Sequence, residues 1–379
     1  MANNSYDFAL AKRDVQEVFD LLVASKPNLL SLIRKGANAA ATKVEWLEDS
    51  LTPLSAAITS FDTDGDGTGI NVASTTGMVA GQLLRFESST GADRGEIVQI
   101  ASVDSATDLT VVRDYGSSVG ATLVSTDTVY RVSTPKNEAT SGVAGAEREP
   151  TANYNYTQIF DRTAKLSKTA IQTGQYGGAN TMAYQLSREM MDINYEINSA
   201  LIYGERVART SSVQGSMGGI ISFLRSGNID TTGSAISATI INNMFKAMFD
   251  DGAGLGDYVI LCNANQARKL SAFNTAGTNP IVNVPYGATS TGGAISTFIS
   301  DLPSMNGFTA RIVVEPSFPK DKLALLDLNN IELAYLRPFS TTNAAVESDD
   351  FIAQRVLGEL SVRIKNGTKA HAMATGLTI

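Results

Sequence analysis

Two segments of this sequence read as the two arms of one long hairpin, although residues 52–154 lie between them. The arms are residues 44–51 (VEWLEDSL) and residues 155–160 (NYTQIF). Between residues 60 and 133, short alternating apolar runs recur between turn-rich stretches, at 69–72, 82–86, 96–100, 109–112 and 128–132. Strands of this length and spacing predict a small all-β barrel or sandwich. The chain therefore has to fold around a long excursion that returns close to where it began.

A long amphipathic helix follows the excursion, at about residues 180–203. Its apolar residues recur with the 3.6-residue period of a helix, at Met182, Leu186, Met190, Ile193, Ile197, Ala200 and Leu201. At a rise of 1.5 Å per residue this helix would be about 36 Å long, well above the usual length. We interpret it as a strut.

Helices and strands alternate in the remaining chain. We expect helices at 238–249 and 264–273, and strands at 258–262, 310–314, 323–326, 331–336 and 359–365. Asn366-Gly367 follows the last of these strands, and an Asn-Gly pair favours a tight turn with two positive φ angles. A closing hairpin is therefore predicted at residues 366–367.

Composition excludes several classes of protein. Only 18% of the residues are charged and 43% are hydrophobic, a balance that favours a surface partly covered by partners. The net charge of −8 gives no general basic surface for nucleic acid. One cysteine, Cys262, allows neither an intrachain disulfide nor a thiolate metal cluster. We find no signal peptide and no apolar run long enough to span a membrane, so synthesis in a reducing cytoplasm is expected.

The residues that bear reactive groups do not gather into a catalytic pattern. Asp62, Asp64 and Asp66 alternate before a glycine, as in a calcium loop, but Ala73 stands where such a loop supplies a bidentate Glu. An acidic turn is the preferred interpretation of these three residues. The single histidine, His371, falls in an alternating run and is interpreted as structural, with no Gly-x-Ser-x-Gly motif in the sequence context that a nucleophile needs. We expect no enzymatic activity, no cofactor and no metal centre.

Trp46 is the only tryptophan, and apolar residues surround it in sequence. This setting favours a packing anchor at a core or a subunit contact over a platform for a ligand. The residues that we assign to packing or assembly are Trp46, Leu47, Leu51, Tyr156, Phe160, Leu186, Met190, Ile193 and Ile197.

Three strings in order carry a resemblance to a known family. They are residues 42–51 (TKVEWLEDSL), 154–160 (YNYTQIF) and 358–366 (GELSVRIKN). Together with the succession of arm, excursion, strut, α/β region and terminal strands, they resemble the major capsid (major head) protein of tailed bacteriophages. The resemblance is to the subfamily with a β-rich insertion in its extended loop, and it implies the α+β Hong Kong 97-type fold.

The resemblance also implies an assignment of domains. Residues 1–40 would form the N-terminal arm, and residues 41–178 the extended loop, with an all-β insertion at 55–135. The peripheral domain would take residues 179–219 and 331–379, with the spine helix at about 180–203. Residues 220–330 would form the axial domain, and its loop at 285–293 would point to the shell's symmetry axes.

The implied function is self-assembly, as pentamers and hexamers, into the icosahedral shell that encloses double-stranded DNA. The DNA would be enclosed without sequence-specific binding, and no membrane would be involved. Scaffolding, portal and decoration proteins are candidate partners. No long charged coiled-coil segment precedes the arm in this sequence, so we expect scaffolding from a separate protein or from a segment that has been cleaved. The expected location is the virion, after assembly in the host bacterial cytoplasm. A covalent crosslink through Lys165 or Lys168 and Asn366 is not expected.

An enzyme whose site forms between subunits is one alternative, although the single histidine, His371, and the absence of clustered acids argue against it. Two other classes of protein remain as alternatives. One is a calcium-dependent binding or adhesion module built on Asp62–Asp66 and the β insertion. The other is a cellular nanocompartment shell protein, which shares the capsid fold but usually lacks the insertion.

Overall fold

The structure is a computed structural model of the chain. It describes residues 28–379 except 50–52, 62–67, 119, 137, 139–141, 143–148, 174–180, 228, 231–232, 234, 255, 273–296, 301–308 and 347–348. Two compact units divide the chain. One contains residues 1–46 and 152–379, and the other contains residues 47–151.

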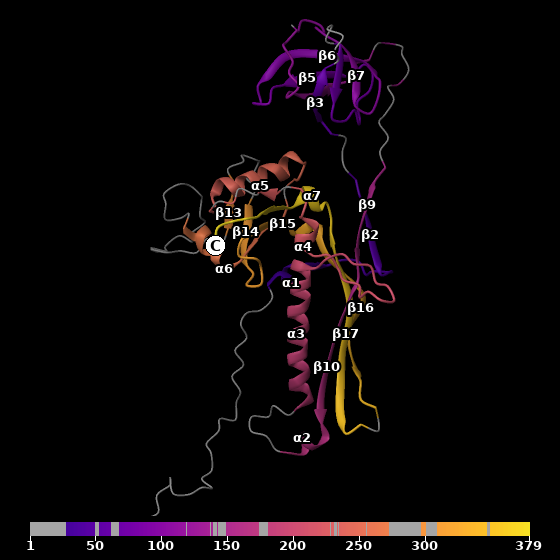
Figure 1. The fold of residues 1–379 in the computed structure, drawn as a ribbon, viewed down its shortest axis with the longest axis vertical. Helices are drawn as coiled ribbons and strands as arrows, with labels where there is room; N and C mark the ends of the chain where they lie inside the picture. The colour runs from indigo at the N-terminus through magenta and orange to yellow at the C-terminus, as the bar shows by residue number, and fades with distance from the viewer. Residues whose placement is uncertain are drawn as a thin grey trace, which may run out of the picture. The chain divides into compact units, whose positions relative to one another are not determined.

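In the first unit, a four-stranded sheet carries the longest helix. Its strands, in spatial order, are β1 (Arg34–Lys35), β16 (Ile331–Asn343), β17 (Phe351–Ile364) and β10 (Gln158–Ser167). The helix α3 (Met182–Tyr203) runs alongside β10 and β17 (Figure 1). Thr181 caps its first turn by accepting a hydrogen bond from the N–H of Tyr184, and Gly204 ends it. The short helices α2 (Lys168–Gln172) and α4 (Ile220–Phe223) flank this layer.

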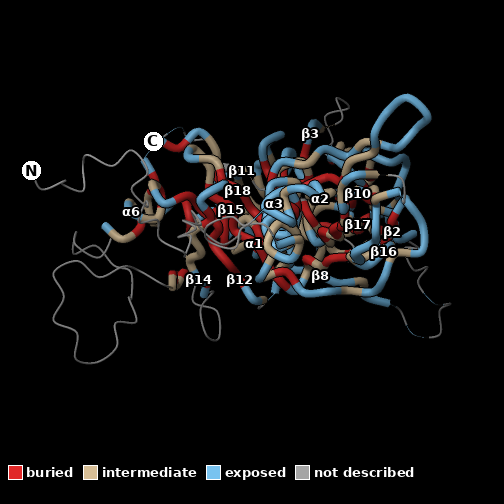
Figure 2. Tube along the Cα trace, turned by 90° about the horizontal axis from the view of Figure 1, so that it is seen from below, coloured by how far each residue is buried: buried red, intermediate tan, exposed pale blue. Residues whose placement is uncertain are grey.

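A six-stranded sheet forms the second layer of the same unit. Its order is β11 (Ile229–Asp230), β18 (Ala372–Ala374), β15 (Leu323–Asp327), β12 (Tyr258–Cys262), β14 (Thr309–Val314) and β13 (Thr297–Ile299). Every residue of β12 and β15 is buried, which explains their continuous apolar sequences (Figure 2). The helices α5 (Ala238–Asp250) and α6 (Ala264–Ala272) pack their apolar residues into the core of this sheet.

Glu315 ties the first described residues of the chain to this unit. It is buried, and its carboxylate accepts hydrogen bonds from the N–H groups of Asn28 (2.9 Å) and Leu29 (3.2 Å), which open α1 (Asn28–Leu32). The next residues form β1, which pairs in parallel with β16. A side chain 286 residues away thus holds the segment that follows residue 27.

The second unit is a closed barrel of antiparallel strands. Its order is β3 (Ser55–Phe61), β4 (Gly69–Val72), β7 (Asp108–Val112), β6 (Asp93–Val103), β5 (Leu83–Glu87) and β8 (Thr128–Ser133). Inward residues such as Leu84, Phe86 and Val98 fill the interior. Glu96 is also fully buried, where Arg113 donates two hydrogen bonds to it at 2.7 and 2.6 Å. Burial alone raises the pKa of Glu96, but hydrogen bonds from Arg113 and from the N–H of Ala121 outweigh burial and lower it.

The five strands predicted from alternation are all present in the barrel, with ends shifted by a few residues. A sixth strand, β3, was missed, because its residues Ser55–Phe61 are small and polar in places where an inward strand usually shows a clear apolar period. The barrel strands run from Ser55 to Ser133, which lies within the predicted insertion. Asp62, Asp64, Asp66 and the loop at 285–293 lie outside the described residues.

The predicted hairpin at residues 366–367 is wrong. Asn366 does take the left-handed conformation, with φ of 52°, but a helical turn, α7 (Gly367–Ala370), follows it. The chain then crosses from the four-stranded sheet to the six-stranded sheet, where β18 pairs with β11 and β15. Asn366 thus has the backbone conformation that its sequence favours, but the strand that follows it, β18, pairs with β11 and β15 and not with β17.

Two of the implied domain limits do not coincide with the limits of the sheets. β10 lies within the implied extended loop, 41–178, yet it pairs along its whole length with β17. β18 lies within the implied peripheral domain, yet it belongs to the six-stranded sheet. The part of the chain that leaves the four-stranded sheet therefore ends at Thr157, just before β10 begins.

Candidate functional site

Residues 42–46 of the first string lie in the first unit, together with the second and third strings that carry the resemblance. We call this place the arm root, and define it as residues 42–46, 154–158, 204–219 and 358–362. Here β2 (Lys43–Glu48) pairs with β9 (Thr151–Tyr156), as expected for two arms of one hairpin. The N–H of Thr157 donates to the carbonyl of Thr42 at 2.9 Å, which closes the pair at its base.

Glu359 stands at the centre of the arm root. It lies on β17 and its side chain is only 3% exposed. Its carboxylate accepts hydrogen bonds from the hydroxyl of Thr157 (2.7 Å), Nη2 of Arg209 (3.2 Å) and Nε of Arg337 (3.0 Å). Burial by itself raises the pKa of Glu359, but these three donors outweigh burial and hold the pKa below its ordinary value. The carboxylate is therefore charged at neutral pH.

Asn155, near the end of β9, connects this strand to β17 and to the loop after α3. It is fully buried, and its amide Nδ2 donates to the carbonyls of Gly218 (3.0 Å) and Val362 (2.8 Å). Its Oδ1 accepts from the N–H of Gly218 at 2.7 Å. Ser361 adds a hydrogen bond from its hydroxyl to the carbonyl of Tyr156 at 2.9 Å. Successive residues of the arm are thus bound to β17 and to the loop after α3.

Aromatic and cationic side chains pack together at the arm root. The rings of Trp46 and Phe223 lie 6.1 Å apart, in the core that α3 shares with the four-stranded sheet. The guanidinium of Arg206 lies 4.8 Å from the Phe223 ring and 5.2 Å from the Tyr154 ring. The ammonium of Lys43 also lies over the Tyr154 ring, 4.4 Å from its centroid. Such cation–π contacts stabilise by about 0.5–2 kcal/mol each and restrict how the rings can move.

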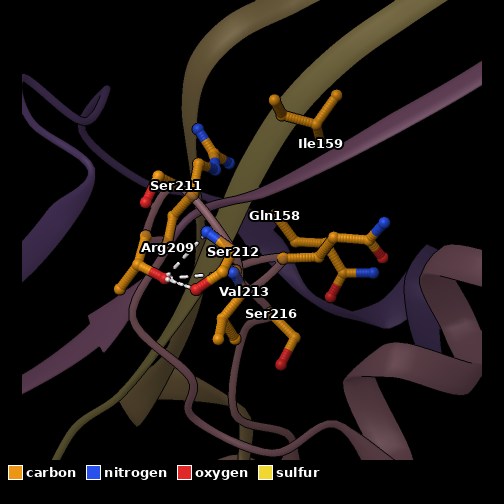
Figure 3. Close-up of a pocket in the computed structure, with 10 residues that line it drawn as sticks. Gln158, Ile159, Arg209, Ser211, Ser212, Val213 and Ser216 are labelled. Atoms are coloured by element: carbon orange, nitrogen blue, oxygen red, sulfur yellow. Dashed lines mark hydrogen bonds between the residues drawn. The ribbon is translucent and has the colours of Figure 1, made fainter.

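The loop after α3 also borders a pocket of about 640 Å³. Gln158, Ile159, Arg209 and the segment Thr210–Ser216 line it. Figure 3 shows side chains that line it, among them Arg209 and Val213. The hydroxyl of Thr210 accepts a hydrogen bond from the N–H of Val213 (3.0 Å), which closes the tip of this loop. The pocket is lined by hydroxyl groups, by the guanidinium of Arg209 and by two apolar side chains, Ile159 and Val213.

The residues predicted for packing or assembly have different environments. Trp46, Phe160, Ile193 and Ile197 are buried in one core, against which Leu186 is partly buried. Tyr156 is half-buried, whereas Leu47 is 72% and Met190 47% exposed. Leu51 lies outside the described residues. That these side chains hold neighbouring subunits together stays a prediction.

Sequence reasoning missed Glu359, Arg209 and Asn155. One signal was available for Glu359, a charged residue next to Leu360 in a predicted strand, where the structure buries every residue from Gly358 to Val362. Its partners Arg209 and Thr157 lie 150 and 202 residues away, so no local pattern could identify them.

Other kinds of site were sought in the described part of the chain. No group of three or more His, Cys, Asp or Glu side chains there could hold a metal ion. Of the helices in the same residues, none has the length and apolar character to cross a membrane.

Comparison with known proteins gives a family and a fold. A family model described as SU10 major capsid protein matches residues 1–378. No curated protein matches the chain. Among solved structures, the capsid of an empty GTA particle is similar, with 10% identity, full coverage of both chains and a TM-score of 0.54. The cyanophage A-1(L) capsid is similar too, with 11% identity, full coverage of both chains and a TM-score of 0.53.

Proposed function

Because the chain belongs to the SU10 major capsid protein family, we propose that the arm root is the part of it that organises shell assembly. The protein is a major capsid protein with the Hong Kong 97-type α+β fold, and it forms the head shell of a tailed bacteriophage. It is a structural protein of the virion, and it assembles with copies of itself. Neither the calcium-dependent module nor the nanocompartment shell has support from these comparisons.

One observation carries the proposal about the arm root. The second and third strings meet where Thr157 donates to the buried carboxylate of Glu359 and Asn155 donates to the carbonyl of Val362, 202 and 207 residues apart in the chain. The first string joins them through the carbonyl of Thr42, which accepts from the N–H of Thr157. Buried polar networks of this kind fix one geometry, because each hydrogen bond is directional. In a shell, a fixed base would let β2 and β9 present the same surface to every neighbouring subunit. The exposed side chain of Leu47, which follows directly, would be covered by such a contact.

In this proposal, the peripheral and axial domains correspond to the two layers of the first unit. The peripheral domain is the four-stranded sheet with α3, and the axial domain is the six-stranded sheet with α5 and α6. Copies would meet as pentamers and hexamers through many contacts of modest strength, so that misplaced subunits can dissociate. Scaffolding, portal and decoration proteins are the expected further partners, and assembly would occur in the host bacterial cytoplasm.

Electron microscopy of the purified chain tests the proposal, alone and together with a candidate scaffolding protein. We expect closed icosahedral shells, or separate hexamers and pentamers. A monomer that persists under both conditions, at concentrations well above those of assembly for related shells, would contradict it.

A further inference from the structure

We propose that Glu359 is a positioning residue for shell assembly, whose carboxylate fixes the β2–β9 pair against the four-stranded sheet. The inference rests on the proposed function of the arm root. The inference goes beyond the proposed function because it assigns the orientation of the β2–β9 pair to one side chain. It also separates that role of Glu359 from the stability of the four-stranded sheet.

The donors to Glu359 come from three separate elements. Thr157 is the single residue between β9 and β10, Arg209 lies in the loop after α3, and Arg337 lies on β16. Thr157 is bound on two sides, since its hydroxyl donates to Glu359 and its N–H donates to Thr42 at the base of β2. Arg209 also approaches the carbonyl of Thr157, at 3.5 Å. The carboxylate therefore acts on the residue where the arm leaves the sheet.

β16 is adapted to bring Arg337 to this point. Its register against β17 shifts on both sides of Arg337, which pairs with Glu359. Phe339, just beyond, covers Gly358, where a Cβ would approach the ring to 2.5 Å. A bulge re-aims side chains at the expense of regular pairing. Here it places a guanidinium against the carboxylate that holds Thr157.

Stability of the sheet alone does not call for this arrangement. Burying a charged cluster is costly, and well-packed apolar residues often stabilise a protein equally well or better. Apolar contacts, however, are non-directional, whereas hydrogen bonds weaken steeply away from their preferred angles. A cluster of three directional donors on one carboxylate restricts the angle of the arm in a way that apolar packing would not.

A second carboxylate of the same sheet supplies a matched control. Glu332 on β16 is 12% exposed and interacts with Arg363 (3.2 Å) and Lys365 (3.0 Å). Arg363 lies at the end of β17 and also donates to the carbonyl of Ala37. Lys365 follows the strand, and its N–H donates to the carbonyl of Asn330. Replacing Glu332 by Gln thus removes a comparable charge cluster without touching the arm root.

The experiment compares three full-length variants with the wild type: Glu359→Gln, Thr157→Val and Glu332→Gln. The amide proton of Thr157 reports closure of the arm base, because it is hydrogen-bonded to Thr42. In unassembled subunits we expect it to exchange about tenfold faster in Glu359→Gln and in Thr157→Val. Glu332→Gln should lower the melting temperature as Glu359→Gln does, but leave this exchange unchanged.

The same variants are then assembled and imaged. We expect Glu359→Gln and Thr157→Val to give fewer closed shells and more aberrant ones, and Glu332→Gln to give normal shells. Normal shells with unchanged Thr157 exchange in Glu359→Gln would overturn the inference, as would equal assembly defects in Glu359→Gln and Glu332→Gln. If Glu359→Gln does not fold, Thr157→Val decides by the same criteria. Failure of the wild type to form shells would contradict the proposed function, while the exchange comparison still decides the role of Glu359.

Discussion

At the scale of single residues, Gly219 shows how closely the chain approaches itself at the end of α3. A Cβ at this position would lie 2.6 Å from the carbonyl oxygen of Ala200 and 2.7 Å from that of Leu201. The N–H of Gly219 also donates to the carbonyl of Gly204 at 2.8 Å. The loop that carries Arg209 can return to the helix only because this residue has no side chain.

We therefore expect Gly219→Ala to destabilise the protein by about 1–3 kcal/mol, as overpacking of a close contact usually does. Thermal unfolding of the purified subunit measures this. Gly254→Ala is the control, because a Cβ at Gly254 meets nothing within 4 Å. Equal melting temperatures for both variants would mean that the loop can move away from α3 at little cost.

His371 makes the stability of the fold depend on pH. It is fully buried, and its Nδ1 accepts a hydrogen bond from the N–H of Asp327 at 3.0 Å. Burial disfavours the charged imidazolium and lowers the pKa to about 4 from the ordinary 6.5. The unfolded chain therefore takes up a proton at a higher pH than the folded chain does.

It follows that the contribution of neutral His371 is fully present above about pH 6.5 and is lost as the pH falls toward 4. At about 1.4 kcal/mol per pKa unit, the loss is at most about 3 kcal/mol. Denaturant unfolding at pH 7, 6, 5 and 4.5 should show it. His371→Asn keeps an acceptor for Asp327 but does not titrate, so its stability should fall less over this range. If the free energy of unfolding fell equally with pH in the wild type and in His371→Asn, a group other than His371 would be responsible for the pH dependence.

At the scale of elements, α3 is buried unevenly along its length. Its buried residues, Ile193, Ile197, Asn198, Leu201 and Ile202, all lie in its C-terminal half. In the N-terminal half, Met190 is 47% exposed, and Met191, at the middle of the helix, is 41% exposed. Arg162 on β10 holds this helix through ion pairs with Glu189 and Glu196, which, being exposed, contribute little. Met190 and Met191 thus present apolar side chains that the described residues of the subunit leave exposed.

We expect Ile197→Ala to destabilise the isolated subunit by about 2–4 kcal/mol, because it leaves a cavity in the core. Met190→Ala should change the melting temperature little, yet reduce the yield of shells if a neighbouring copy covers this face. Thermal unfolding and shell yield from the same preparations separate the two effects. Unchanged yield in Met190→Ala would show that its face stays in contact with solvent in the shell.

At the scale of the whole molecule, charge is distributed unequally between the two units. Residues 47–151 contain 15 of the 38 acidic residues and only 6 of the 30 basic ones. The remaining chain is close to neutral. Because DNA is densely negative, an acidic unit repeated across a shell is more stable away from the packaged genome.

We therefore expect the barrel unit to be accessible from outside a DNA-filled head. Thr90→Cys, at an exposed turn of the barrel, provides a site for a bulky maleimide, and the native Cys262 is buried. The variant should be labelled in intact heads as fast as in dissociated subunits. Labelling that begins only after the heads are disrupted would mean that the unit is covered or faces the DNA.

The sequence by itself determined the elements whose signals are local. The alternation of the barrel strands, the period of α3 and the apolar run of β12 were confirmed, because side-chain direction within a strand or helix follows from backbone geometry alone. The three strings identified the family for a similar reason, since they can be read without knowing their contacts.

Only the tertiary structure decided which of these elements find partners. Met190 and Ile197 lie two turns apart on one stripe, yet Met190 is exposed and Ile197 is buried. The helical period gives the spacing of apolar side chains, but not which of them the rest of the chain covers. Asn366 adopted its local turn, yet β18 paired in the other sheet. The carboxylate of Glu359 accepts hydrogen bonds from Thr157, Arg209 and Arg337, which are far apart in the sequence and meet only in the folded subunit. Burial and hydrogen bonding depend on such long-range contacts, whereas periodicity and turn preference depend on neighbours in the chain.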